Sequence, residues 1–397
     1  MNEDFLTYQA QTSPHPLALR IERAEGSFIF DDKGKAYLDF VAGVSANTLG
    51  HQPSSVKEAI SAQLDRYMHV MVYGEFIQSP QLDLCKFLAD KLPKTLNCTY
   101  LTNSGTEATE GAIKLAKRFT GRPEIVAARN AYHGNTQGAM SVCGKEEQNR
   151  AFRPLIPGTR FIRFNEVDDL KTIGSNTAAV ILETIQGGAG FIVPEEDYLK
   201  KVKDRCIETG ALLILDEIQS GIGRTGKLFG FMNYEVVPDI LITGKGLGGG
   251  MPIGAFVSSS EMMSVLRDKP KLGHITTFGG HPVVAAGALA TLKEVCEMNL
   301  MDAVFEKERI IRDALERHPM VKEIRGTGLM LALILDDPDK TNSLIHKALE
   351  QGLILFWLLY EPRAVRITPP LNISEEDLLK GCRIIAGILD ELHENLP

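Results

Sequence analysis

Seven short apolar runs between residues 98 and 258 constrain the fold of this chain most strongly. They are Cys98–Leu101, Glu124–Ala128, Arg160–Phe164, Ala178–Leu182, Ala211–Leu215, Asp239–Ile242 and Gly254–Val257. Several are unbroken stretches of Val, Ile and Leu, as expected of strands buried on both faces of a parallel sheet. Helical patterns lie between them, most clearly at Ala108–Phe119 and Glu196–Glu208. This alternation predicts an α/β domain with a mostly parallel seven-stranded sheet.

The pattern changes from about Pro282 onward. Helices are predicted at Pro282–Met298, Met301–His318, Thr341–Gln351 and Ser374–Asn395, and strands at Leu329–Leu335, Leu353–Trp357 and Ala364–Ile367. At the other end, Ser27–Phe30 and Ala36–Phe40 predict a small sheet. We therefore expect an N-terminal segment, residues 1–55, that is part of a small domain. A large domain over 56–285 and a smaller α+β C-terminal domain over 286–397 complete the chain.

Charge and composition exclude several classes of protein. The 51 acidic and 43 basic residues are interspersed and sum to −8, so no basic tract is present to bind nucleic acid. No apolar run approaches the roughly 18 residues of a membrane helix, and the acidic N-terminus does not resemble a signal peptide. The six cysteines and nine histidines show no metal-binding spacing. We expect a soluble, cytoplasmic protein with reduced thiols, no metal site and no membrane partner.

The segment Asn103–Ala108 follows the first predicted strand and opens a helix. Ser104 and Glu107 have the spacing of a capping box, which alone would explain them. A helix N-terminus with glycine and hydroxyl groups is also suited to bind phosphate, because its free N–H groups attract anions. Taken by itself, the segment is compatible with both interpretations.

Two further residues follow predicted strands. Asp216 ends a buried strand, where α/β proteins bind ligands, although an acid here can also simply cap a turn. Lys245 follows another strand and is surrounded by glycines, which allow a ligand to approach the backbone closely. Most lysines are solvated surface charges, but a partly desolvated lysine can act as a nucleophilic amine.

The glycines of Gly221–Gly226 match the G-x-G-x-x-G pattern of dinucleotide-binding proteins. A true dinucleotide site opens a helix directly after its strand, whereas Lys227–Pro238 has no clear helical period. A nucleotide-binding module is therefore kept only as an alternative of a different class.

A phosphate-binding helix end, an acid at a strand end and a lysine in a glycine loop together match the requirements of pyridoxal 5′-phosphate (PLP). The lysine amine forms a Schiff base with the aldehyde of PLP. The acid keeps the pyridine nitrogen protonated, so that the ring can accept electrons.

The chain resembles the class III aminotransferases of PLP fold type I, which include ornithine, acetylornithine and γ-aminobutyrate aminotransferases. The similarity runs almost from end to end. It is carried by Phe40–His51, Asn103–Ala108, Ala131–Gly134, Glu183–Gly187, Leu215–Gly226, Gly244–Gly254, Thr276–Gly280 and Val365–Leu371. The resemblance implies a homodimer with composite active sites that transfers an amino group to a keto acid such as 2-oxoglutarate or pyruvate.

The resemblance also implies a role for each matching residue. For the cofactor, these are Lys245 for the Schiff base and proton transfer, Asp216 for the pyridine nitrogen, Gln219 for the ring hydroxyl, Tyr132 for stacking, Ser104, Gly105 and Thr106 for phosphate, Glu183 for support of Asp216, and Thr277 for the partner subunit's phosphate. Arg366 is implied to bind a substrate carboxylate. His133 is interpreted as a packed imidazole behind these groups.

Two positions depart from the family. Asn135 stands where relatives usually carry a carboxylate-binding arginine, and Gly188 stands where they usually carry a glutamate that neutralises the C-terminal arginine. We therefore expect poor activity with acetylornithine and γ-aminobutyrate, unless another arginine such as Arg163 supplies the missing charge. The donor, an amino acid or an ω-amine, stays open. A racemase or aminomutase reaction on the same scaffold is the alternative enzyme.

Overall fold

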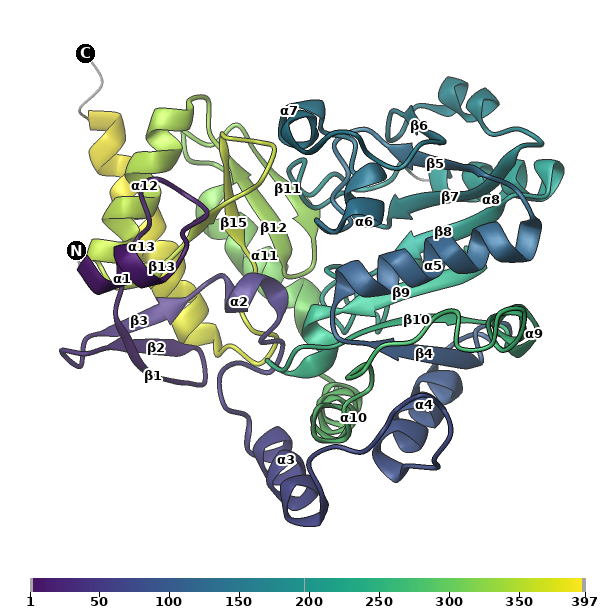
Figure 1. Cartoon of the computed structure of the whole chain (residues 1–397). Helices are drawn as coiled ribbons and strands as arrows, with labels where there is room; N and C mark the ends of the chain where they lie inside the picture. Colours follow the sequence, from purple (N-terminus) through teal and green to yellow (C-terminus); the bar gives the residue numbers. More distant parts are fainter. Residues whose placement is uncertain (1–2, 196, 395–397) are drawn as a thin grey trace.

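The structure is a computed structural model that describes residues 3–195 and 197–394 (Figure 1). Its largest sheet has the strand order β4-β10-β9-β8-β7-β5-β6. Only β10 runs against its neighbours, and the other pairings are parallel. The strands are β4 Cys98–Thr102, β5 Glu124–Ala128, β6 Thr159–Ile162, β7 Thr177–Glu183, β8 Leu212–Asp216, β9 Ile240–Gly244 and β10 Gly254–Ser258. Each predicted run overlaps one of them, so the mostly parallel seven-stranded sheet is confirmed.

Helices cover both faces of this sheet, which explains its apolar strands. Side chains alternate along a strand, and in β7 Val180 and Leu182 join one hydrophobic cluster whereas Ala179 and Ile181 join another. The helix α5 (Gly105–Thr120) packs in the second cluster and crosses in front of the sheet in Figure 1. The helices α4 (Ser79–Lys91), α8 (Tyr198–Thr209) and α10 (Pro282–Glu297) pack in the first cluster.

The C-terminal part forms a separate α+β layer, as predicted. Its antiparallel sheet has the order β11-β12-β15-β14. These strands are β11 Glu323–Thr327, β12 Met330–Ile334, β14 Phe356–Trp357 and β15 Ala364–Ile367, and the helices beside them are α11 Val304–Leu315, α12 Pro338–Glu350 and α13 Glu375–Glu394. The edge strand β11 was not predicted, because only one of its five residues, Ile324, is both apolar and buried.

The N-terminal strands join the C-terminal part of the chain. A four-stranded sheet has the order β1-β2-β3-β13, in which β3 pairs in parallel with β13. Its strands are β1 Ile21–Glu25, β2 Phe28–Asp31, β3 Ala36–Asp39 and β13 Leu353–Ile354. Leu38 and Phe40 also belong to the C-terminal hydrophobic cluster. This pairing fits an N-terminal segment that is part of the small domain, although the exact domain limits stay a prediction.

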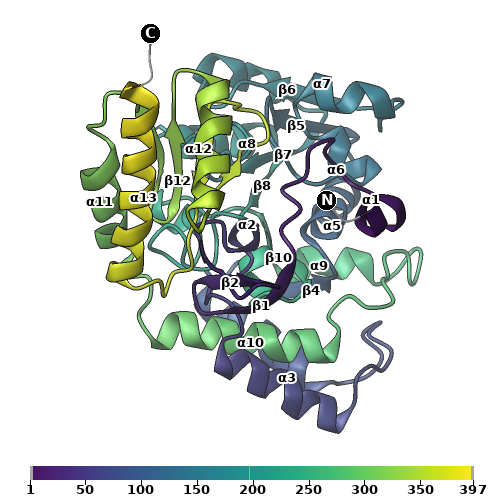
Figure 2. The same ribbon diagram turned by 90° about the vertical axis from the view of Figure 1, so that its left-hand side faces the viewer.

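The remaining helices are short or peripheral. They are α1 Glu3–Tyr8, α2 Ala42–Ser45, α3 Ser54–Arg66, α6 Gln137–Ser141, α7 Glu146–Asn149 and α9 Ser260–Met263, with single 3-10 turns at Arg150–Phe152, Val167–Thr172, Gly230–Asn233, Lys245–Gly248 and Ser264–Leu266. Figure 2 shows α3 beside α10 below the rest of the molecule. The predicted ends of two helices, Glu196 and Asn395, lie outside the described residues.

Across the described residues, no helix combines the length and apolar character that a bilayer crossing requires. The six cysteines are all free, and Cys143, Cys206 and Cys382 are buried.

Candidate active site

A cavity of about 420 Å³ opens where the central parallel strands end. Glu183 and Asp216 are the last residues of β7 and β8, and Lys245 directly follows β9. Because carboxyl ends of parallel strands meet at one edge of a sheet, residues far apart in sequence converge there. The predicted residues that line this cavity are Gly105, Thr106, Tyr132, Asn135, Glu183, Gly188, Asp216, Gln219, Lys245 and Arg366.

Lys245 presents its amine inside the cavity. Its Nζ donates to Gln219 Oε1 at 3.4 Å. Burial lowers the pKa of Lys245 to about 8, and the positive charge of Arg366 contributes to the shift. The backbone of Lys245 has a φ of +42°, a left-handed conformation that costs a non-glycine residue about 1–2 kcal/mol. Strain of this kind gathers at functional sites, and a lysine with a lowered pKa supplies a neutral amine near physiological pH.

Asp216 is held by a histidine behind the cavity. His133 Nδ1 lies 2.7 Å from Asp216 Oδ2, and the backbone N–H of Ile218 donates to Asp216 Oδ1 at 3.0 Å. Burial by itself would lower the pKa of His133, but the hydrogen bond and charge of Asp216 outweigh it and raise the pKa. The contact with Asp216 therefore favours the protonated form of the His133 imidazole. This contact agrees with the interpretation of His133 as a packed imidazole.

The N-terminus of α5 reaches the cavity through Gly105 and Thr106. Ser104 does not line the cavity, since its Oγ accepts from the backbone N–H of Glu107 at 3.3 Å and caps the helix. The Glu107 carboxylate in turn accepts from the backbone N–H of Asn103 at 2.8 Å. The plain capping interpretation therefore accounts for Ser104, while the two following residues stand at an anion-attracting helix end.

Glu183 supports the cavity wall. Its carboxylate accepts from the backbone N–H groups of Tyr132 at 3.1 Å and of Gly187 at 3.0 Å. Burial raises the pKa of Glu183 to about 7, although the charge of His133 opposes the shift. Tyr132, held by this contact, exposes 36% of its surface at the cavity. Its ring is therefore available to stack on a planar ligand.

Arg366 lies in the same cavity and has hydrogen-bond donors without a partner among the described residues. It is only 5% exposed, and its Nε and Nη1 atoms have no hydrogen-bond partner among the described residues. Burial lowers the pKa of Arg366 to about 10, and no carboxylate is among the causes of the shift. A buried guanidinium without a partner is costly, so this fork is suited to receive the two oxygens of a carboxylate.

The two departures from the family both line the cavity. Gly188 leaves room for Tyr360, because a Cβ at Gly188 would lie 3.0 Å from the Tyr360 ring. Asn135 is exposed at the wall. The alternative that Arg163 replaces the missing charge is wrong, because Arg163 lies outside the lining and its guanidinium is paired with Asp169 at 2.8 Å.

Thr277 is the other predicted residue outside the lining. It is exposed on the segment before α10, away from the cavity of its own chain.

Sequence reasoning also missed several apolar residues that do line the cavity. These are Val44, Ile185, Ile218, Phe356, Trp357 and Leu359. Ile218 could have been found from its place between Asp216 and Gln219, whereas the apolar run Leu353–Trp357 predicts only a short strand.

The glycines of Gly221–Gly226 serve packing. A Cβ at Gly223 would lie 2.7 Å from Leu371, and one at Gly226 would lie 2.4 Å from Phe305. The next regular element is the 3-10 turn Gly230–Asn233, so the helix that a dinucleotide site requires is absent from this described segment. Close packing explains the spacing of these glycines.

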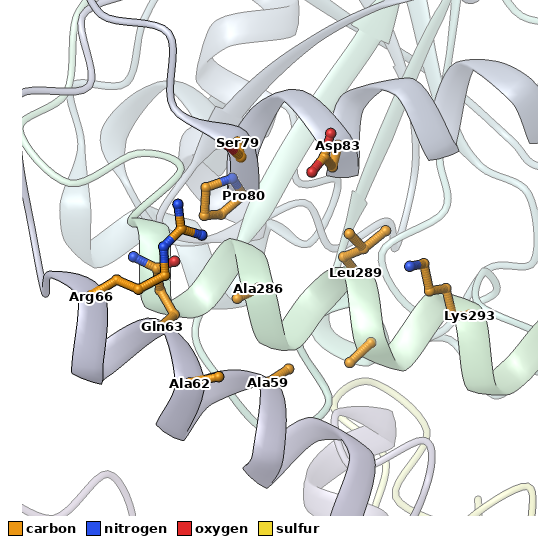
Figure 3. A pocket seen from close by; sticks show the side chains of 11 residues that line it. Ala59, Ala62, Gln63, Arg66, Ser79, Pro80, Asp83, Ala286, Leu289 and Lys293 are labelled. Carbon is orange, nitrogen blue, oxygen red and sulfur yellow. The ribbon is translucent and has the colours of Figure 1, made fainter.

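A second hollow, of about 270 Å³, lies between α3, α4 and α10 (Figure 3). Alanines form much of its floor, and Arg66, Asp83 and Lys293 stand at its sides. None of the predicted site residues belongs to it.

The family model for class-III aminotransferases matches residues 8–389 of the chain. The acetylornithine aminotransferase of Caldanaerobacter subterraneus subsp. tengcongensis is 37% identical over 94% of this chain and 95% of its own. The putrescine aminotransferase of Pectobacterium atrosepticum is 36% identical over 100% of this chain and 88% of its own. A solved ornithine aminotransferase of Toxoplasma gondii, with PLP at partial occupancy in its active site, superposes with a TM-score of 0.92 at 32% identity, covering 98% of this chain and 93% of that one.

Proposed function

Because the chain belongs to the family of class-III aminotransferases, we propose that its amine donor is an α-amino acid whose carboxylate binds Arg366. The enzyme has PLP fold type I and uses PLP to transfer an amino group from a donor to a keto acid. The observation that carries the proposal is the buried, unpartnered fork of Arg366 in the cavity that Lys245 also lines. A carboxylate there lies next to the carbon that reacts.

The residues of the cavity fit PLP. Gly105 and Thr106 at the start of α5 would hold its phosphate, and Tyr132 would stack on its ring. Asp216, which His133 holds in place, would bind the pyridine nitrogen, and Lys245 would be the point of covalent attachment. When bound, PLP supplies an electron sink for the bond broken at the substrate carbon.

Lys245 would also move the proton. Its lowered pKa, about 8, lets the amine take a proton from the substrate carbon and return it within one turnover. Gln219, which accepts from Lys245 Nζ, would orient the amine.

The neighbours of Arg366 argue against donors with a distant carboxylate. Gly188 provides no charge to screen Arg366 while an ω-amine reacts, and Asn135, which also lines the cavity, offers only neutral hydrogen bonds. A distal carboxylate would lose a charge-assisted hydrogen bond worth about 1.5–3 kcal/mol. Acetylornithine and γ-aminobutyrate should therefore be used roughly ten- to a hundredfold less well than an α-amino acid.

We further propose that two copies of the chain form a homodimer in the cytoplasm. Two segments, one containing residues 68–77 and the other Thr277 and Phe278, carry large exposed apolar side chains. The ring centroids of His69 and Phe278 lie 4.9 Å apart, so the two segments are neighbours. The exposed apolar side chains are Met68, Met71, Phe76, Ile77 and Phe278. A second copy would cover this surface and bring Thr277 to the neighbouring phosphate. A monomer that is fully active during sedimentation would refute the composite site.

Single-turnover measurements with a panel of amine donors test the donor class. PLP-loaded enzyme is mixed with each donor without keto acid, and loss of the cofactor's visible absorbance is followed. Apolar and small α-amino acids should react fastest and stop at the amine form of the cofactor until keto acid is added. Acetylornithine or γ-aminobutyrate as the best donor would overturn the proposal.

A further inference from the structure

The side of the cavity next to Arg366 is apolar. We define the apolar arc as Val44, Phe356, Trp357 and Leu359, all of which line the cavity. Phe356 lies directly opposite Arg366 in the antiparallel pair β14–β15. Directly opposite residues project on the same face of a sheet, with Cβ atoms about 5 Å apart. A ligand whose carboxylate binds Arg366 therefore shares its cavity with the phenyl ring of Phe356.

The arc is held in place by its own contacts. Trp357 Nε1 donates to Asn342 Oδ1 at 2.8 Å, which fixes the indole against α12. The rings of Phe356 and Trp357 meet edge to face, with centroids 5.2 Å apart. Val44 stands on a left-handed turn in which Ala42, Gly43, Val44 and Ser45 all have positive φ. This backbone strain is typical of functional sites, and here it presents an aliphatic side chain to the cavity.

The arc leaves apolar surface uncovered inside the cavity. Phe356 is 40% exposed and Leu359 is 56% exposed. An apolar ligand group that covers these side chains removes apolar surface from water on both partners, and this favours binding. A charged group in the same place loses its hydration and gains no partner.

A second anionic group has no cation to bind. Apart from the buried His133, the cations that line the cavity are Arg366 and Lys245. Lys245 takes part in the amine transfer and is therefore not available to bind a second carboxylate. Asn135 is neutral, and the space beside Gly188 is filled by Tyr360, whose backbone N–H donates to Gly188 O at 2.9 Å. The residues that line the cavity therefore provide a cation for only one substrate carboxylate, at Arg366.

We propose that donor and acceptor are both monocarboxylic compounds whose remaining carbon skeleton is apolar. The donor is an α-amino acid with an apolar side chain, and the acceptor is pyruvate or an apolar keto acid rather than the dicarboxylate 2-oxoglutarate. The exchange balances without an oxidant or reductant, because the donor becomes a keto acid as the acceptor becomes an amino acid. This inference rests on the proposed function, since both substrates use Arg366.

Binding of unreactive carboxylates to the PLP-loaded enzyme tests the inference without turnover. Calorimetry compares 4-methylpentanoate, with one carboxylate and an apolar end, with pentanedioate, which has a second carboxylate at similar length. We expect 4-methylpentanoate to bind roughly 10- to 100-fold more tightly. Equal affinity, or tighter binding of pentanedioate, would overturn the proposal.

Variants separate the arc from the missing cation. Phe356→Ala should weaken 4-methylpentanoate binding roughly tenfold while pentanedioate changes little. Asn135→Arg should strengthen pentanedioate binding and raise kcat/KM for 2-oxoglutarate roughly 10- to 100-fold. Ile207→Ala removes an exposed apolar side chain of α8 outside the cavity and should leave every value unchanged. Failure of Asn135→Arg to improve either dicarboxylate would also count against the proposal.

The two proposals fail in different ways. Rapid reaction of an apolar α-amino acid followed by preferred use of 2-oxoglutarate would refute the monocarboxylate inference and leave the proposed donor class intact. Absence of reaction with every α-amino acid would refute the proposed function itself.

Discussion

Replacing Arg366 with methionine should abolish carboxylate recognition and stabilise the ligand-free protein. Here the guanidinium is 95% buried, and two of its nitrogen atoms have no partner in the described chain. Its charge is therefore a cost to the fold, which a bound carboxylate would offset.

The size of this cost follows from the pKa of Arg366, which burial lowers from 12.5 to about 10. Each pKa unit corresponds to 1.36 kcal/mol, so the charged group destabilises the ligand-free fold by about 3 kcal/mol. Because the pKa is depressed in the folded state, the cost is complete below about pH 10 and is relieved as the pH rises toward 12.5. In the wild type, Arg366 Cζ lies 5.5 Å from the centroid of the Phe191 ring. Methionine cannot make this cation–π contact, and its loss destabilises the variant by about 1 kcal/mol. The net gain is about 2 kcal/mol.

Thermal unfolding of the PLP-loaded protein measures this gain. Arg366→Met should raise Tm by a few degrees and lose the additional stabilisation that 4-methylpentanoate gives the wild type. Arg224 is a matched control, since it is also fully buried with a pKa lowered to about 9, but its guanidinium donates to the backbone oxygens of Leu329 and Pro369. Arg224→Met should raise Tm less than Arg366→Met does, because it also deprives two backbone carbonyls of their donor, which costs about 1–3 kcal/mol each. A lower Tm for Arg366→Met, or carboxylate stabilisation that survives in it, would refute the reasoning.

Three further predictions concern proton transfer. Asp216→Asn should slow the single-turnover reaction of a donor by about 10²-fold, or roughly 3 kcal/mol, since it removes the charge that holds the pyridine nitrogen protonated; an unchanged rate would contradict this role. His133→Phe should lower the same rate, whereas His133→Asn, which keeps a donor toward Asp216, should recover most of it; equal rates would indicate that His133 only fills space. The rate at which PLP attaches to the PLP-free protein should rise with pH toward a midpoint near 8 as the Lys245 amine loses its proton, and Arg366→Met should move that midpoint upward because the charge of Arg366 lowers the pKa of Lys245; a midpoint that does not move would rule out this coupling.

The central sheet could be predicted from sequence because burial on both faces requires continuous apolar runs. In β7, all seven residues from Thr177 to Glu183 are buried. The strand β1 (Ile21–Glu25) was missed for the opposite reason, because its residues are largely exposed and three of the five are charged. Edge strands are defined by their pairing, and a single sequence does not display pairing.

Asp216 and Lys245 could be singled out from the sequence because each comes at the end of a buried apolar run, whereas the roles of the other polar residues came from the family resemblance. The contact between His133 and Asp216 spans 83 residues, so only the fold brings the two together. Ser104 illustrates the limit of this reasoning. The same hydroxyl fits a phosphate site and a helix cap, and the geometry assigns it to the cap.

The apolar arc could not be predicted because its residues obey the rules of a hydrophobic core. The sequence around Phe356 and Trp357 is a continuous apolar run like that of a buried strand, and β14 is indeed a strand. What distinguishes it is position: Phe356 pairs with Arg366 on β15, at the sheet edge that faces the cavity. Sequence patterns report whether a side chain avoids water, and a substrate pocket and a core satisfy that condition equally. The polar residues of the chain therefore indicate the chemistry of PLP from the sequence alone. The apolar residues that we propose contact the substrate can be told apart from core residues only in the structure.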